Sequence, residues 1–181
     1  MSAHTSERLA VVLIGHGAPA TDCPPQLVGE LMSLEWRAAS AAHGPHHLEG
    51  RAKELDAEIR NWPRHAGNDP YQAGLERLAE ALRPLLPTDL FAVGYNEFCR
   101  PSIAEAVGCV IRRGASRILV IPSMLTPGGV HSEQDIPQAL DALRRTYPQL
   151  AIEYLWPFDL RQVAALLASH LRRAATRSAR A

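Results

Sequence analysis

Several features of secreted and membrane proteins are missing from this sequence of 181 residues. Its three cysteines, Cys23, Cys99 and Cys109, are odd in number and lack CxxC spacing. They fit reduced thiols in a cytosol better than a disulfide framework or a zinc knot. The sequence has no basic start followed by an apolar stretch, and no run of eighteen apolar residues. We therefore expect a cytoplasmic protein.

An excess of charge of one sign is also absent. The 19 basic and 19 acidic side chains cancel, so no overall field attracts nucleic acid or an anionic membrane surface. We expect a small substrate, with no nucleic-acid and no membrane partner. No internal repeat or linker divides the chain, and its length suits one domain with its own core. Residues 1–181 are therefore predicted to form a single domain.

Apolar runs alternate with helical patterns along the chain. The runs that predict buried strands are residues 9–14, 90–95, 118–121 and 151–156. Apolar residues at helical spacing predict helices within 27–62, 75–86, 103–111, 136–143 and 160–171. This alternation predicts an α/β fold with a four-stranded parallel sheet and helices on both faces.

Two segments fall outside this regular pattern. Residues 27–62 read as a helical insertion that is broken in the middle by a loop with His43, His46 and His47. Those imidazoles could capture a metal, or they could simply lie on an exposed interhelical loop. The basic residues 172–181 read as a fraying helix end or a disordered tail, and we assign them no function.

Polar residues directly follow three of the predicted strands. His16 lies between two glycines after the first strand, Glu97 follows the second, and His131 follows the third. Because parallel strands point their carboxyl ends to one edge of a sheet, these side chains can converge there. The alternatives are that the glycines only make a turn and that His131 is a solvated loop residue. Residues 132–135 are further predicted to form a capping box that opens a helix.

Two histidines and a glutamate can hold a divalent first-row metal while leaving coordination positions open. Each of the three can also accept a proton near neutral pH. We therefore predict that His16, Glu97 and His131 form a metal-binding and catalytic site.

Three motifs carry a resemblance to a known family. The first is VVLIGHGAP at residues 11–19, and the second is NEFCRPSI at residues 96–103. The third lies within residues 121–137, where a proline-rich strand end is followed by Gly129, by His131 and then by Asp-Ile-Pro. In these motifs the sequence resembles the CbiX-type sirohydrochlorin chelatases of the class II tetrapyrrole chelatase family. The resemblance implies that His16 and His131 are the active-site histidines and that Glu97 is the acidic residue beside them.

The resemblance implies an activity as well. Such chelatases insert a divalent metal into a tetrapyrrole without ATP, so we expect insertion into sirohydrochlorin in cobalamin-type or siroheme-type biosynthesis. Cobalt is preferred over iron or nickel as the metal substrate, and no organic cofactor is expected. The side chains of Met124, Leu125, Phe98 and Trp156 could pack on the macrocycle or serve ordinary packing. Arg100 could pair with the peripheral carboxylates.

The chain also departs from the family pattern. Shorter members lack much of the segment between His16 and the second strand, so the 27–62 insertion could cover the cavity, change specificity or mediate association. Larger members carry two such halves in one chain, and we therefore expect a homodimer that completes the site.

Two alternative functions were weighed. The first is a non-catalytic tetrapyrrole or metal carrier with the same fold. The second is a phosphohistidine phosphatase with His16 as nucleophile, which is disfavoured because Gly15 stands where those enzymes have an arginine. No GxSxG motif supports a serine hydrolase.

Overall fold

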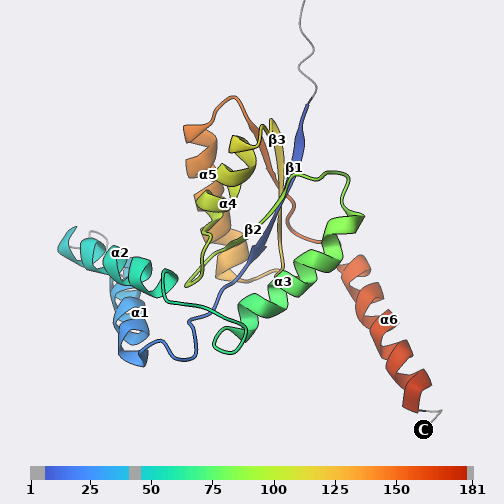
Figure 1. Cartoon of the computed structure of the whole chain (residues 1–181), viewed down its shortest axis with the longest axis horizontal. Coiled ribbons are helices and arrows are strands. Elements are labelled where there is room, and N and C mark those ends of the chain that lie inside the picture. The colour runs from blue at the N-terminus through green and yellow to red at the C-terminus, as the bar shows by residue number, and fades with distance from the viewer. Residues whose placement is uncertain (1–6, 41–45, 179–181) are drawn as a thin grey trace, which may run out of the picture.

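The computed structural model describes residues 7–40 and 46–178 (Figure 1). Its strands are β1 (Leu9–Gly15), β2 (Phe91–Tyr95), β3 (Arg117–Pro122) and β4 (Ala151–Tyr154). All of them pair in parallel, in the order β2-β1-β3-β4. The helices are α1 (Pro25–Ser40), α2 (His46–Arg60), α3 (Pro70–Leu82), α4 (Ile103–Arg112), α5 (Ile136–Thr146) and α6 (Leu160–Ser178). The predicted parallel α/β fold is confirmed.

The central strand β1 is apolar throughout because both of its faces are covered. Val12 and Ile14 point into a core shared with α4 and α5, where Leu140 is fully buried. Val11 and Leu13 point to the opposite face, which α3 covers. Alternate side chains of a strand lie on opposite faces, so a strand between two helical layers needs a continuous apolar run.

A third core lies apart from the sheet, inside the hairpin of α1 and α2 beside the carboxyl edge of the strands (Figure 1). Leu31, Leu34, Leu55 and Ile59 form its centre, and Phe98 from the loop after β2 inserts among them. This hairpin occupies the stretch that was predicted as a helical insertion.

The histidines predicted for the interhelical loop are placed differently. The structure assigns His46 and His47 to the first turn of α2, and His43 lies outside the described residues.

Helix α6 differs from the other helices because it extends away from the body of the protein (Figure 1). Asp159 caps its start by accepting a hydrogen bond from the Arg161 amide at 2.8 Å. Its leucines are more than half exposed: Leu160 (53%), Leu166 (60%), Leu167 (56%) and Leu171 (68%). The helix continues to Ser178, so most of the predicted basic tail is helical.

The predicted capping box at residues 132–135 is wrong. Residues His131–Asp135 form a π-helical turn, in which the Ile136 amide bonds the His131 carbonyl, and α5 starts only after it. Pro137 has no N–H and cannot bond the carbonyl four residues before it, which favours the wider turn. Ser132 is buried instead of capping a helix.

The helix predicted within residues 75–86 ends earlier than its apolar pattern, and Leu85 is 79% exposed. The α-helix ends at Leu82, and the 3-10 turn that follows turns this side chain outward.

Gly17 allows two loops at the edge of the sheet to touch. Its φ is +96°, and a Cβ added there would lie 1.9 Å from the carbonyl oxygen of Glu97. Only glycine adopts this backbone conformation without strain, and only glycine leaves room for the neighbouring backbone.

We predict that Gly17→Ala lowers the free energy of unfolding by about 1–3 kcal/mol, because the new methyl group forces the two loops apart. Urea denaturation measures this difference. Gly29→Ala is the matched control, since a Cβ there meets nothing within 4 Å. Equal stability of the two variants would contradict the proposed backbone contact.

Candidate metal centre and active site

The structure brings His16, Glu97 and His131 together at the carboxyl edge of the sheet. One ligand atom from each lies within 4.8 Å of the others. His16 Nε2 is 4.0 Å from Glu97 Oε2, and His131 Nδ1 is 3.5 Å from Glu97 Oε1. The two imidazole rings meet edge to face with their centroids 4.4 Å apart. Each side chain is partly exposed, so an ion can reach all three.

Hydrogen bonds define which nitrogen of each imidazole is free. His16 Nδ1 lies 2.7 Å from the Gly17 carbonyl oxygen, and His131 Nδ1 lies 2.6 Å from Asp135 Oδ2. The side-chain nitrogen of Asn96 also lies 3.0 Å from His131 Nδ1. A carbonyl and a carboxylate only accept, so these two partners favour the tautomer with the proton on Nδ1 in both rings. Both Nε2 atoms therefore keep a lone pair, which can bind a metal or accept a proton.

Backbone hydrogen bonds hold the loops after β1 and β2 against each other. The Asn96 amide donates to the Gly15 carbonyl at 2.9 Å, and the Glu97 amide donates to the His16 carbonyl at 2.8 Å. The Tyr71 hydroxyl of α3 accepts from the His16 amide at 2.7 Å. The positions of His16 and Glu97 thus follow directly from the pairing of the two strands.

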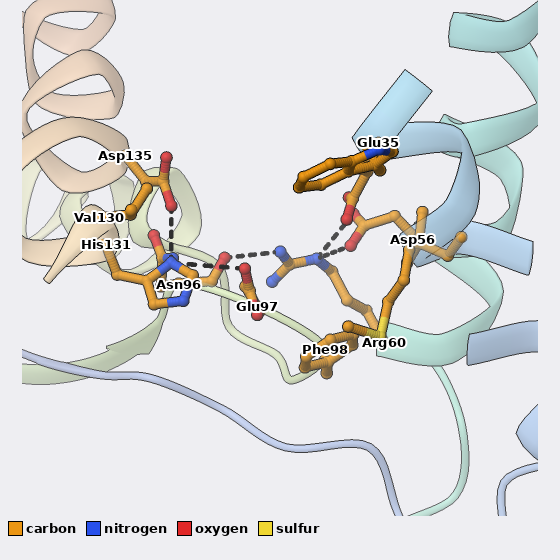
Figure 2. A pocket seen from close by; sticks show the side chains of 12 residues that line it. Glu35, Asp56, Arg60, Asn96, Glu97, Phe98, Val130, His131 and Asp135 are labelled. Atoms are coloured by element: carbon orange, nitrogen blue, oxygen red, sulfur yellow. Dashed lines mark hydrogen bonds and ion pairs between the residues drawn. The ribbon is translucent and has the colours of Figure 1, made fainter. Parts of the chain in front are cut away.

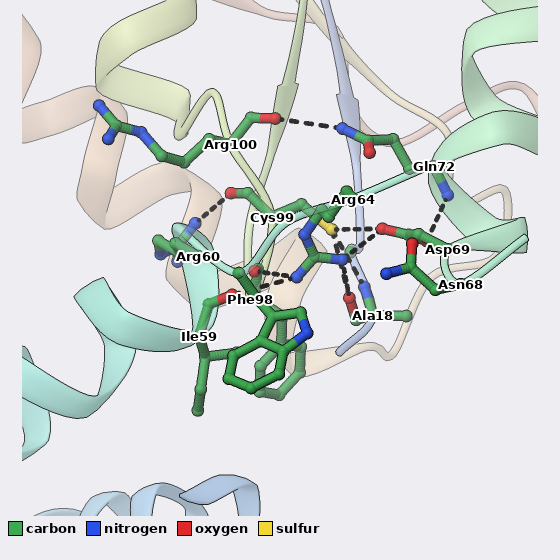
Figure 3. A network of polar contacts seen from close by, with 12 residues as sticks. Ala18, Ile59, Arg60, Arg64, Asn68, Asp69, Gln72, Phe98, Cys99 and Arg100 are labelled. Carbon is green, nitrogen blue, oxygen red and sulfur yellow. Dashed lines mark hydrogen bonds and ion pairs between the residues drawn. The ribbon is translucent and has the colours of Figure 1, made fainter. Parts of the chain in front are cut away.

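Two arginines fix the rest of the loop that carries Glu97 (Figure 3). Arg60 donates to the carbonyls of Asn96 and Cys99 at 2.8 and 2.9 Å. Arg64 donates to the Phe98 carbonyl at 2.6 Å and pairs with the buried Asp69. Loop carbonyls that face inward need such donors.

The thiol of Cys99 lies beneath this loop and is fully buried. Burial raises its pKa to about 11. The thiol is therefore neutral at physiological pH and takes no part in nucleophilic chemistry.

Two members of this candidate metal site, Glu97 and His131, line a cavity of about 580 Å³ (Figure 2). One wall comes from the sheet edge, and the other comes from the α1–α2 hairpin. The lining residues are Leu31, Met32, Glu35, Trp36, Asp56, Arg60, Asn96, Glu97, Phe98, Val130, His131 and Asp135. The volume lies within the usual range for small-molecule sites.

Only one of the side chains proposed to contact a macrocycle or its carboxylates lines this cavity, namely Phe98. Met124 packs against the main core, and Trp156 stacks on Tyr154 with centroids 6.5 Å apart. Leu125 does not line it either. Arg100 instead pairs with Glu105 outside the cavity. The structure gives no support to the suggested role of Arg100.

Sequence reasoning missed two groups of residues. Asp135, which orients His131, was interpreted as part of a capping box, although its spacing of four residues would place the two side chains on one helical face. Glu35 and Trp36 line the cavity from α1, but nothing in the sequence tells which sheet edge that helix approaches.

We predict that Asp135→Asn lowers Co²⁺ affinity by about 10-fold, because the ring of His131 loses the partner that holds its tautomer. Isothermal titration calorimetry measures the affinity. Asp141→Asn is the control, since Asp141 pairs with Arg144 on α5 and does not line the cavity. Equal affinities for the two variants would show that Asp135 does not orient the histidine.

Within residues 7–40 and 46–178, no helix combines the length and the apolar character needed to cross a membrane.

Comparison with known proteins gives concordant matches. A sirohydrochlorin cobaltochelatase from Priestia megaterium is 29% identical over 100 residues, which are 55% of this chain and 32% of that protein. A sirohydrochlorin cobaltochelatase from Methanocaldococcus jannaschii is 36% identical over 77 residues, 42% of this chain and 53% of that protein. The matches thus span a third to a half of these relatives' lengths.

A crystal structure of a cobalamin biosynthesis CbiX protein from Marinobacter aquaeolei has the same fold, with a TM-score of 0.50 and 17% identity. The similarity covers 91% of this chain and 98% of that one. The family model for CbiX matches residues 66–174, more than half of the chain. The chain therefore belongs to the CbiX family.

Proposed function

We propose that this protein inserts a divalent metal into sirohydrochlorin, with cobalt preferred and iron or nickel as further candidates. The observation that carries the proposal is the His16, Glu97 and His131 cluster, of which Glu97 and His131 line a cavity of about 580 Å³. The names of the relatives, sirohydrochlorin cobaltochelatases, support the same substrate.

Insertion exchanges the water ligands of the metal for four macrocycle nitrogens, and two pyrrole protons leave. In this proposal the Nε2 lone pairs of His16 and His131 hold the ion beside the macrocycle. Glu97 balances its charge and accepts a proton. A mixed set of two nitrogens and one carboxylate leaves coordination positions open, so the ion can pass to the macrocycle.

The experiment is an anaerobic absorbance time course of sirohydrochlorin with Co²⁺, Fe²⁺ or Ni²⁺. We expect His131→Ala to reduce the rate of insertion by about 100-fold, since a ligand that positions the metal is lost. His65→Ala is the control, because His65 is exposed on the loop before α3. Unchanged rates in His16→Ala and His131→Ala would refute the site. A spectral shift on binding without faster insertion by the wild type would support a carrier instead.

We also propose that the protein forms a homodimer in which α6 makes the contact between the two copies. The exposed leucines of α6 form an apolar surface that its own domain leaves uncovered. The α3 face of the sheet is also incompletely covered. A hollow lies between α3 and Ser123 at the end of β3, and Leu78 beside it is 51% exposed. One chain thus carries both an uncovered helix, α6, and an incompletely covered surface, the α3 face of the sheet. This combination supports a contact between two copies.

This dimer has a different role from the one expected from sequence. The α1–α2 hairpin already supplies the second wall of the cavity, so a partner is not needed to form that wall.

We predict that Leu167→Arg shifts the protein to a monomer, because a charge placed in an apolar contact is costly to desolvate. Sedimentation velocity measures the oligomeric state. Gln162→Arg adds the same charge at an exposed polar position of α6 and should leave the state of the wild type unchanged. A wild type that is monomeric at micromolar concentration would refute the dimer.

We also propose that residues 1–181 are a single CbiX-type domain with its insertion at about 27–62. A cytoplasmic location and a role in cobalamin-type or siroheme-type biosynthesis complete the proposal. The free thiols of Cys23, Cys99 and Cys109 support a reducing compartment.

A further inference from the structure

Helix α1 presents two different faces. Leu31 and Leu34 are buried and pack toward α2 within the hairpin. Met32, Glu35 and Trp36 lie on the side that lines the cavity, and Met32 and Trp36 are 57% and 76% exposed. Apolar groups this exposed, one helical turn apart and flanking a carboxylate, offer a flat ligand an apolar surface with an acid at its centre.

Glu35 faces the metal-binding cluster across the cavity (Figure 2). Its pKa is raised, first by desolvation and then by the negative charges of Glu97, Asp56 and Asp135, while the charge of Arg60 offsets part of the effect. These four groups come from the loop after β2, from α2 and from the turn before α5. Glu35 nevertheless remains open to solvent through the cavity.

Asp56 is the other carboxylate of the hairpin wall, but its surroundings differ. Arg60 Nε donates to both of its oxygens, at 2.8 and 2.7 Å. Both oxygens of Asp56 are therefore already engaged by a guanidinium, which leaves them less free to bind a further proton donor. Arg60 influences Glu35 only through its charge. Glu35 is therefore the better base of the two.

We propose that Glu35 accepts a pyrrole proton at the face of the macrocycle opposite the His16, Glu97 and His131 cluster. This inference rests on the proposed chelatase function. It adds a second catalytic carboxylate, carried by the insertion and not by the sheet edge.

Electrostatics favours two opposite faces. A divalent ion that approaches from the sheet edge repels any proton leaving on the same side, so the far side is the easier exit for one proton. That N–H bond breaks, its electron pair stays on the nitrogen and binds the metal, and the proton forms an O–H bond on Glu35. The resulting acid then loses the proton to water. The second proton leaves on the cluster side, so one M²⁺ replaces two H⁺.

The test compares Glu35→Gln with the wild type at saturating sirohydrochlorin and Co²⁺ over a range of pH. We expect the variant to be slower by about 100-fold near neutral pH, a typical contribution of a general base. The ratio of wild-type to variant rates should fall toward one as the pH is lowered, because protonated Glu35 cannot accept a proton. Taking the ratio removes any effect that protonation of the histidines has on both proteins.

Three further measurements make the result specific. Fluorescence titration without metal should show that Glu35→Gln binds sirohydrochlorin as the wild type does. Glu35→Asp should recover part of the rate, since it keeps a carboxylate. Glu58→Gln is the control on the same hairpin, because Glu58 is exposed and does not line the cavity. It should insert metal at the wild-type rate.

A rate ratio near one at every pH would overturn the inference, as would a slower rate explained by weaker sirohydrochlorin binding. A wild type that inserts no metal would refute the proposed function itself, and the two failures are therefore distinguishable.

Discussion

One backbone hydrogen bond joins the main chains of two residues of the candidate site, from the Glu97 amide to the His16 carbonyl at 2.8 Å. It continues the pairing of β1 with β2 beyond the ends of both strands. On the other side of β1, the Ser123 amide donates to the Ile14 carbonyl at 2.8 Å and extends the pairing with β3. His16 and Glu97 are therefore positioned by the sheet and not by flexible loops, which is how precise sites are usually built.

The loop after β2 serves two structures at once. Glu97 points into the cavity, while the next residue, Phe98, is 8% exposed and packs in the hairpin core. Phe98 has a positive φ of 56°, and this turns the two side chains apart. Arg60 and Arg64 then bond the carbonyls on both sides of the turn. The hairpin is thus bonded to the loop that carries Glu97, although the hairpin makes its own core.

Much of this arrangement could be predicted from the sequence, because it depends only on the order of strands and helices along the chain. Apolar runs alternating with helices imply a parallel sheet, and the residues directly after its strands must share an edge. His16, Glu97 and His131 are of this kind. Asp135 is not of this kind. It lies in the π-helical turn, which depends on the backbone hydrogen bond that Pro137 cannot form. Glu35 was also not predicted as a site residue, because helical periodicity identifies the apolar face of a helix but not the element beside which the helix lies. For α6, the pattern shows an apolar stripe without telling which chain covers it.

Cys99 has a consequence for the metal. Thiolate sulfur binds cobalt, iron and nickel strongly, and a reactive thiol two residues from Glu97 would compete with the candidate site for such an ion. Burial beneath the arginine-bonded loop keeps this sulfur protonated and out of reach. A soft sulfur atom therefore stands next to the candidate metal site without being available to bind a metal there.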